Sequence, residues 1–127
     1  MDLQHARINA LNATSEAIGS FVLSNFRHKK LRINTKKDGS IVTEVDSEAE
    51  MLARSTLLDQ FSEDGFLGEE HGEIKGSSGF RWVVDPIDGT ASFARGVPLF
   101  GTLIGLEFEG KPIAGAANLP AIRESIS

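Results

Sequence analysis

Residues 80–90 read Phe-Arg-Trp-Val-Val-Asp-Pro-Ile-Asp-Gly-Thr, and this stretch carries the strongest structural signal in the chain. Its first five residues are rich in the aromatic and β-branched side chains typical of a buried strand. Asp85 and Pro86 follow, and we expect the strand to end there because proline has no amide hydrogen to donate to a sheet. The strand therefore leads directly into acidic residues.

The residues before this strand predict two helices. Apolar side chains at helical spacing, among them Leu11, Ile18 and Val22, predict one long helix over residues 2–26. The basic residues 28–30 near its end would complement the helix dipole, and we interpret them as a solvated surface.

The second predicted helix follows a turn at residues 38–40 and a short β-prone run at residues 41–43. Ser47 and Glu50 have the spacing of a capping box, in which a serine and a glutamate satisfy the first free amides of a helix. This pattern predicts a helix that begins at Ser47 and ends before Glu63.

The remaining residues predict strands and loops. Residues 72–79 are rich in glycine and serine and predict a flexible loop, and residues 99–108 and 112–118 predict an antiparallel hairpin. No helix or strand is predicted for residues 123–127, so we expect the sequence to be truncated. Two helices followed by a run of strands indicate an α+β fold with a mostly antiparallel sheet.

Composition narrows the function classes. The 127 residues suit one domain, and a net charge of -5 with a pI near 5.1 argues against nucleic-acid and anionic-membrane partners. No stretch predicts a membrane span or a signal peptide, so we expect a cytoplasmic protein. Because the chain has no cysteine, a metal would be held by oxygen or histidine.

The acidic residues after the strand predict a metal site beside a phosphate site. Asp85 and Asp88 can face one cavity across the proline turn, and the Ile87 carbonyl can supply a third oxygen to a hard cation. Gly89 and Thr90 would begin a short helical turn, whose first amides favour a phosphate. The alternative is a solvent-exposed turn, but this motif arises by chance in fewer than about one in ten thousand chains of this length.

These residues resemble a known signature. The pattern Trp-x-x-Asp-Pro-x-Asp-Gly-Thr-x-x-Phe at residues 82–93 resembles that of the inositol monophosphatase family, whose members hydrolyse phosphate monoesters with Mg²⁺. Gly-Glu-Glu at residues 68–70 and Asp-x-x-x-Val-Thr-x-x-Asp at residues 38–46 are similar to two further family elements. Taken alone, Glu69 could belong to a solvated loop and Asp46 could cap a helix.

The resemblance implies a fold and a domain organisation. Residues 1–127 would form the N-terminal metal- and phosphate-binding domain, which is the first half of the αβαβα sandwich of the inositol monophosphatase and fructose-1,6-bisphosphatase type. The family's C-terminal α/β domain, with a further metal-binding aspartate, would be absent. We therefore expect the chain to be inactive alone, or to act as a homo-oligomer such as a dimer or with a separate second half.

The resemblance also implies roles for individual residues. Four acidic side chains meeting without a counter-ion would repel one another, and divalent cations remove that conflict. The implied cofactor is Mg²⁺ at two or three sites, with Mn²⁺ as an alternative. The implied metal ligands are Glu69, Asp85, the Ile87 carbonyl, Asp88 and, more weakly, Asp46. The implied catalytic residues are Glu69, Thr90 and Asp46, and the implied phosphate-binding residues are Asp88, Gly89 and Thr90.

The expected substrate is a small phosphorylated metabolite. Inositol-specific members usually have asparagine where this chain has Ser92, and residues 93–106 are similar to the histidinol-phosphatase branch. We therefore expect hydrolysis of histidinol phosphate, a step of histidine biosynthesis. The alternatives are an inositol-1-monophosphatase, another sugar or nucleotide phosphatase, and a half-domain that binds metal or phosphate without turnover in an assembly.

Overall fold

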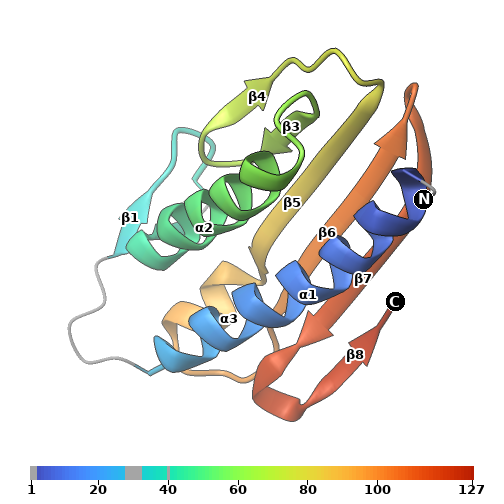
Figure 1. The fold of residues 1–127 in the computed structure, drawn as a ribbon. Coiled ribbons are helices and arrows are strands. Elements are labelled where there is room, and N and C mark those ends of the chain that lie inside the picture. The colour runs from blue at the N-terminus through green and yellow to red at the C-terminus, as the bar shows by residue number, and fades with distance from the viewer. Residues whose placement is uncertain (1–2, 28–32, 40) are drawn as a thin grey trace.

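Two long helices lie side by side on one face of a six-stranded sheet (Figure 1). The computed structural model describes residues 3–27, 33–39 and 41–127. The elements are α1 (Leu3–Ser24), β1 (Ile33–Thr35), β2 (Ile41–Thr43), α2 (Glu44–Gln60), β3 (Gly65–Gly68), β4 (Gly72–Ile74), β5 (Phe80–Asp88), α3 (Thr90–Ala94), β6 (Gly101–Phe108), β7 (Lys111–Leu119), a 3₁₀ turn η1 (Pro120–Ile122) and β8 (Glu124–Ile126). Helices followed by strands confirm the predicted α+β class.

Helix α1 forms where the apolar spacing predicts it. Leu11, Ile18 and Val22 are buried against the sheet, as expected for one apolar stripe of a helix. The basic residues 28–30 lie outside the described residues. Within the described ranges, no helix combines the length and the apolar character that a bilayer crossing requires.

Helix α2 begins earlier than predicted. Its N-cap is Thr43, which shares a capping box with Asp46, so the prediction that the helix starts at Ser47 is wrong. The Thr43 hydroxyl donates to the Asp46 carboxylate and accepts the Asp46 amide hydrogen. This pair supplies partners to free backbone amides at the start of the helix. Glu50 is fully buried instead of serving as a capping partner.

The sheet has the strand order β4-β3-β5-β6-β7-β8, and only β3 and β5 pair in parallel among these neighbours. The prediction of a mostly antiparallel sheet is therefore confirmed. Two local predictions are wrong. Residues 72–74 form the edge strand β4 instead of a loop, and β5 continues past Pro86 to Asp88 through an irregularity in its pairing with β6.

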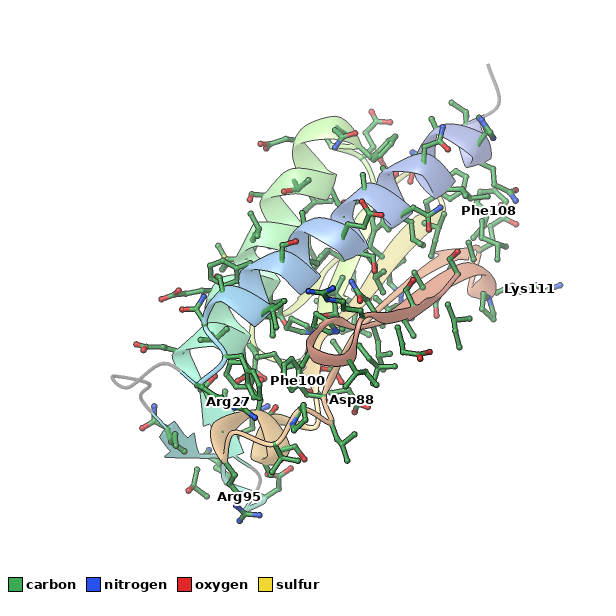
Figure 2. The ribbon with its side chains drawn as sticks, turned by 90° about the horizontal axis from the view of Figure 1, so that it is seen from below. Arg27, Asp88, Arg95, Phe100, Phe108 and Lys111 are labelled. Atoms are coloured by element: carbon green, nitrogen blue, oxygen red, sulfur yellow. The ribbon has the colours of Figure 1, made fainter. Side chains whose placement is uncertain are left out.

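Strands β6 and β7 form the predicted hairpin. Glu109 and Gly110 connect them, both with positive φ, as two-residue hairpin turns require. Residues 124–126, for which no element is predicted, form β8 at the edge beside β7. Figure 2 shows the two ends of this hairpin, with Phe108 and Lys111 at the turn and Phe100 close to Asp88 at the other end.

The core lies between the helices and the sheet. Its large fully buried side chains come from both layers and include Leu11, Ile18, Leu57, Phe66, Trp82, Phe93, Phe100 and Leu106. An ionic group is buried with them, since Arg7 donates to both oxygens of Asp64 at 2.7 and 2.8 Å. Trp82 and Ser78 also donate to Asp64, so its carboxylate has four hydrogen bonds near the start of β5.

Candidate metal and phosphate site

The irregular end of β5 brings two acidic residues to one pocket. In a regular strand, residues three apart point to opposite faces of the sheet. Between Asp85 and Asp88 the register with β6 shifts, and a bulge of this kind redirects side chains. Pro86 lies inside the bulge, where its missing amide hydrogen is tolerated, and its carbonyl accepts the Thr102 hydroxyl at 2.8 Å.

The pocket has a volume of about 470 Å³ and opens beside α3. It gathers residues from the β1–β2 turn, the turn after β3, the end of β5 and the start of α3. Its lining includes Glu69, Asp85, Ile87, Asp88, Gly89 and Thr90, together with Lys36. Six of the residues predicted for the site therefore surround one space, and the seventh, Asp46, lies behind Thr90.

Gly89 forms the entrance to α3. Its φ of 89° is a conformation that side chains disfavour, and a Cβ there would lie 2.9 Å from the Leu99 carbonyl oxygen. Glycine is therefore required on two counts. The short helical turn predicted to begin at Gly89 and Thr90 is present as α3, and the first amides of a helix lack carbonyl partners in a preceding turn.

Asp46 connects helix α2 to the start of α3. One of its oxygens accepts the amide and hydroxyl of Thr43, each at 2.7 Å, and the other accepts the Thr90 hydroxyl at 2.9 Å. The Thr90 oxygen also lies 3.0 Å from the Ile87 carbonyl, so one hydroxyl proton is shared between two acceptors. The alternative that Asp46 caps a helix is thus correct in part, as the third residue of the capping box.

The electrostatics of the pocket are unfavourable for carboxylates alone. Burial, then the charges of Glu69, Asp88 and Asp46, raise the pKa of Asp85 to about 6. Burial likewise raises the pKa of Asp46, against the opposing effect of its hydrogen bonds. A half-buried carboxyl that faces other carboxylates is stabilised by a cation, so the pocket is suited to one.

The donor chemistry fits a hard divalent cation. Glu69, Asp85 and Asp88 line the pocket together with Ile87, and oxygen is the ligand that Mg²⁺ prefers. No three acidic or histidine side chains within the described ranges are close enough to form a preassembled metal cluster. The side chain of Glu69 is 62% exposed, and its charge opposes that of Asp85.

Two residues near the pocket were not predicted from the sequence. Lys36 extends from the β1–β2 turn, with its amine 2.7 Å from Glu70 and 4.0 Å from Glu69. Glu50 accepts the backbone amides of Glu70 and His71 from inside the fold. The signal available for Glu50 was its spacing of four residues from Asp46, which puts both acids on one face of α2.

Comparisons with known proteins show which family this chain is similar to. Residues 2–127 match the model of the inositol monophosphatase family. The chain is 44% identical over 110 residues to a histidinol-phosphatase of Chlorobaculum parvum, a match that covers 87% of this chain and 42% of that protein. It is 45% identical over 93 residues to a histidinol-phosphatase of Mycobacterium tuberculosis, covering 73% and 36%.

Two further matches extend the comparison. The chain is 36% identical over 124 residues to an inositol-1-monophosphatase of Rhizobium meliloti, covering 94% of this chain and 47% of that protein. The fold is similar to the crystal structure of the extragenic suppressor protein suhB from Bartonella henselae, with a TM-score of 0.89, 32% identity, and coverage of 94% and 47%. The chain spans less than half the length of each of these proteins.

Proposed function

The chain belongs to the inositol monophosphatase family, and from this membership we propose that residues 1–127 are the metal- and phosphate-binding part of an enzyme that hydrolyses small phosphate monoesters. The observation that carries the proposal is the pocket in which Glu69, Asp85, Asp88 and the Gly89–Thr90 turn meet. Acidic oxygens for a cation and helix amides for a phosphate lie side by side there, as hydrolysis of a phosphate ester requires.

We assign the cation ligands to the oxygens that line the pocket. Glu69, Asp85, Asp88 and the Ile87 carbonyl would hold Mg²⁺, with Mn²⁺ as an alternative. The Ile87 carbonyl accepts Thr90 with one lone pair and keeps a second one available. When bound, the divalent cation supplies Lewis-acid chemistry, which lowers the pKa of water and neutralises charge on the phosphate.

Thr90 is proposed to orient the attacking water. Asp46 and the Ile87 carbonyl hold the only hydroxyl proton of Thr90, so its oxygen can accept a hydrogen bond from a water in the pocket. Asp46 would then fix the direction of this oxygen, with Glu69 as the second group that contacts the water. Asp88 and the amides of Gly89 and Thr90 would hold the phosphate.

We propose histidinol phosphate as the substrate, with inositol monophosphate as the alternative. Ser92 and residues 93–106 support the first, as do two named histidinol-phosphatases with 44% and 45% identity. The inositol-1-monophosphatase with 36% identity supports the second. Hydrolysis of histidinol phosphate would imply a role in histidine biosynthesis.

Phosphate release from histidinol phosphate, inositol monophosphate and an aryl phosphate tests the proposal, with Mg²⁺ and with a chelator. In a form that also contains the second half of the enzyme, we expect Mg²⁺-dependent turnover that the Asp88→Asn substitution abolishes while the fold is retained, because it removes a ligand charge at similar volume. Thr90→Ala should lower kcat more than the matched control Ser92→Ala. Wild-type turnover by Asp88→Asn would show that the site is misplaced.

The face of the sheet opposite α1 and α2 has features that favour association with another chain. A shallow apolar hollow on that face is lined by β5, β6 and β7 residues together with Ile126, and Leu103 is 38% exposed there. Exposed apolar surface favours association. We propose that a second copy or a further half of the enzyme covers this face, and light scattering during size-exclusion chromatography tests it. A monodisperse monomer would contradict the homo-oligomer.

A further inference from the structure

Glu50 is a buried acid that the proposed mechanism does not use. It lies on α2 four residues after Asp46, with no exposed surface. Within the described part of the chain, no lysine or arginine side chain forms an ion pair with it. A buried carboxylate without a counter-ion is unfavourable unless its oxygens accept hydrogen bonds. The partners of Glu50 therefore indicate why an acid is present at this position.

Both oxygens of Glu50 bind the backbone next to Glu69. One accepts the amide of Glu70 at 2.9 Å, and the other accepts the amide of His71 at 2.7 Å. These distances are typical of the strong hydrogen bonds that charged acceptors make. Residues 69–71 are the three-residue turn between β3 and β4, whose flanking glycines 68 and 72 are paired. The carboxylate thus holds the turn directly after Glu69.

Gly68 provides the space for this contact. A Cβ at Gly68 would lie 2.2 Å from the carboxyl carbon of Glu50, a distance that no real contact allows. The carboxylate therefore packs against the backbone just before Glu69 and binds the amides just after it. His71 adds a second connection to the same helix, because its ring nitrogen lies 3.1 Å from the Ser47 carbonyl.

Helix α2 holds two sides of the pocket through two buried acids. Asp46 binds the Thr90 hydroxyl and Glu50 binds the turn of residues 69–71. Residues four apart in a helix are separated by about 6 Å along its axis and lie on one face. A rigid helix therefore sets the distance between the turn that carries Glu69 and the start of α3.

From these contacts we propose that Glu50 is a positioning residue for the cation site. Its carboxylate fixes the backbone of residues 69–71, so that the exposed side chain of Glu69 faces the pocket that Asp85 and Asp88 line. The inference rests on the proposed function, because it requires Glu69 to be a ligand. Mutation of a residue that orients a metal ligand typically changes the metal affinity by about 10–100-fold.

Titration of the protein with Mg²⁺ by calorimetry tests the inference through Glu50→Gln. Glutamine keeps the volume, but its NH₂ group faces a backbone N–H, so one of the two hydrogen bonds is lost. We expect the Kd for Mg²⁺ to rise about 10–100-fold. Glu48→Gln is the matched control, since it makes the same charge change at an exposed position of α2 and should alter the Kd less than about twofold.

Amide hydrogen exchange provides a readout that does not depend on metal. Glu50→Gln should speed exchange at residues 70 and 71, while the core amides of β5 stay protected. If Glu50→Gln fails to fold, Gly68→Ala perturbs the same contact from the other side and should raise the Kd similarly. Gly115→Ala is its control, because a Cβ there has only an ordinary contact at 3.6 Å.

The outcomes separate this inference from the proposed function. A folded Glu50→Gln protein with the wild-type Kd, or with unchanged exchange at residues 70 and 71, would overturn the inference and leave the proposed function standing. An equal loss of affinity in Glu48→Gln would also overturn it, because distant charge would then explain the effect. A wild-type protein that does not bind Mg²⁺ would overturn both.

Discussion

Asp64 and Asp85 are acidic residues near opposite ends of the same part of the sheet, and their surroundings differ. Asp64 is 1% exposed and accepts four hydrogen bonds, two of them from the guanidinium of Arg7. That guanidinium lies over the ring of Phe80, 3.9 Å from its centre. Asp85 is half-buried at the pocket and faces the charges of Glu69, Asp88 and Asp46.

The difference teaches how to separate a structural acid from a functional one. The fold supplies the Asp64 carboxylate with hydrogen-bond donors for both oxygens, so its role is structural and requires no ligand from outside the chain. Asp85 is held where other acids oppose its charge, an arrangement typical of sites that bind a cation or perform chemistry. The first acid should therefore matter for stability and the second for ligand binding.

The largest expected effect is at Asp64. Asp64→Ala leaves the Arg7 guanidinium buried without a counter-ion and the Trp82 indole N–H without an acceptor. Loss of one partner of a buried ion pair typically costs about 3–5 kcal/mol. We expect urea denaturation to show a fall of this size in the free energy of unfolding. The exposed neighbour Glu63 is the control, since Glu63→Ala should change it by less than about 0.5 kcal/mol.

A fall of less than about 1 kcal/mol in Asp64→Ala would contradict the structural role of the pair.

The next effect, at Asp85, should have the opposite sign for stability. Asp85→Asn removes a carboxyl that its neighbours oppose, so the metal-free protein should become more stable at pH 7.5 by about 1 kcal/mol. The affinity for Mg²⁺ should fall by at least about 10–100-fold, which is the effect of mutating a residue that only positions a metal ligand. Denaturation with a chelator and calorimetry with Mg²⁺ measure the two quantities. Destabilisation with unchanged affinity would make Asp85 a structural acid like Asp64.

The pH dependence of stability sharpens the same comparison. Because the pKa of Asp85 is raised from 3.8 to about 6, the folded protein binds this proton more tightly than the unfolded chain does. The associated destabilisation is absent below about pH 4, develops as the pH rises to 6, and is complete above it. The full shift corresponds to about 3 kcal/mol, which solvent screening of a half-exposed group reduces to about 1 kcal/mol.

Thermal or urea denaturation between pH 4 and 7.5 measures this effect as the difference between wild type and Asp85→Asn without metal. We expect the stability of the wild type to decline relative to the variant across that window. Saturating Mg²⁺ should remove the decline, because the cation stabilises the charged carboxylate. A difference that does not change with pH would contradict the electrostatic account of the pocket.

The smallest expected effect is at Lys36, a cation that lies among the pocket acids. The Lys36–Glu70 pair is partly exposed, so Lys36→Met should change the free energy of unfolding by less than about 1 kcal/mol. Removing a positive charge from the pocket should strengthen Mg²⁺ binding by about two- to fivefold at low salt. Lys37→Met is the control at an exposed neighbour. Weaker Mg²⁺ binding in Lys36→Met would show that the lysine supports the site.

Local patterns in the sequence determined much of this fold. Apolar spacing predicted α1, the run at residues 80–84 predicted a buried strand, and residues 99–108 and 112–118 predicted the hairpin. These features depend on neighbours within a few residues, so they can be read along the chain. Asp85, Asp88 and Gly89 could be named in the same way, because their types and spacing are those of cation and phosphate sites. Glu69 and Asp46 were implied only by the resemblance to the family signature.

Only the tertiary structure decided which polar residues are buried and what they contact. Asp64 accepts a hydrogen bond from Arg7, which is 57 residues away in the sequence, and Asp46 accepts one from Thr90, which is 44 residues away. Glu50 accepts the amide of Glu70, which is 20 residues away. The spacing of Ser47 and Glu50 matched a capping box, but Thr43 and Asp46 form the box because Glu50 is buried behind the turn of residues 69–71. Such pairings depend on how helices pack on the sheet, and a local pattern contains no information about that packing.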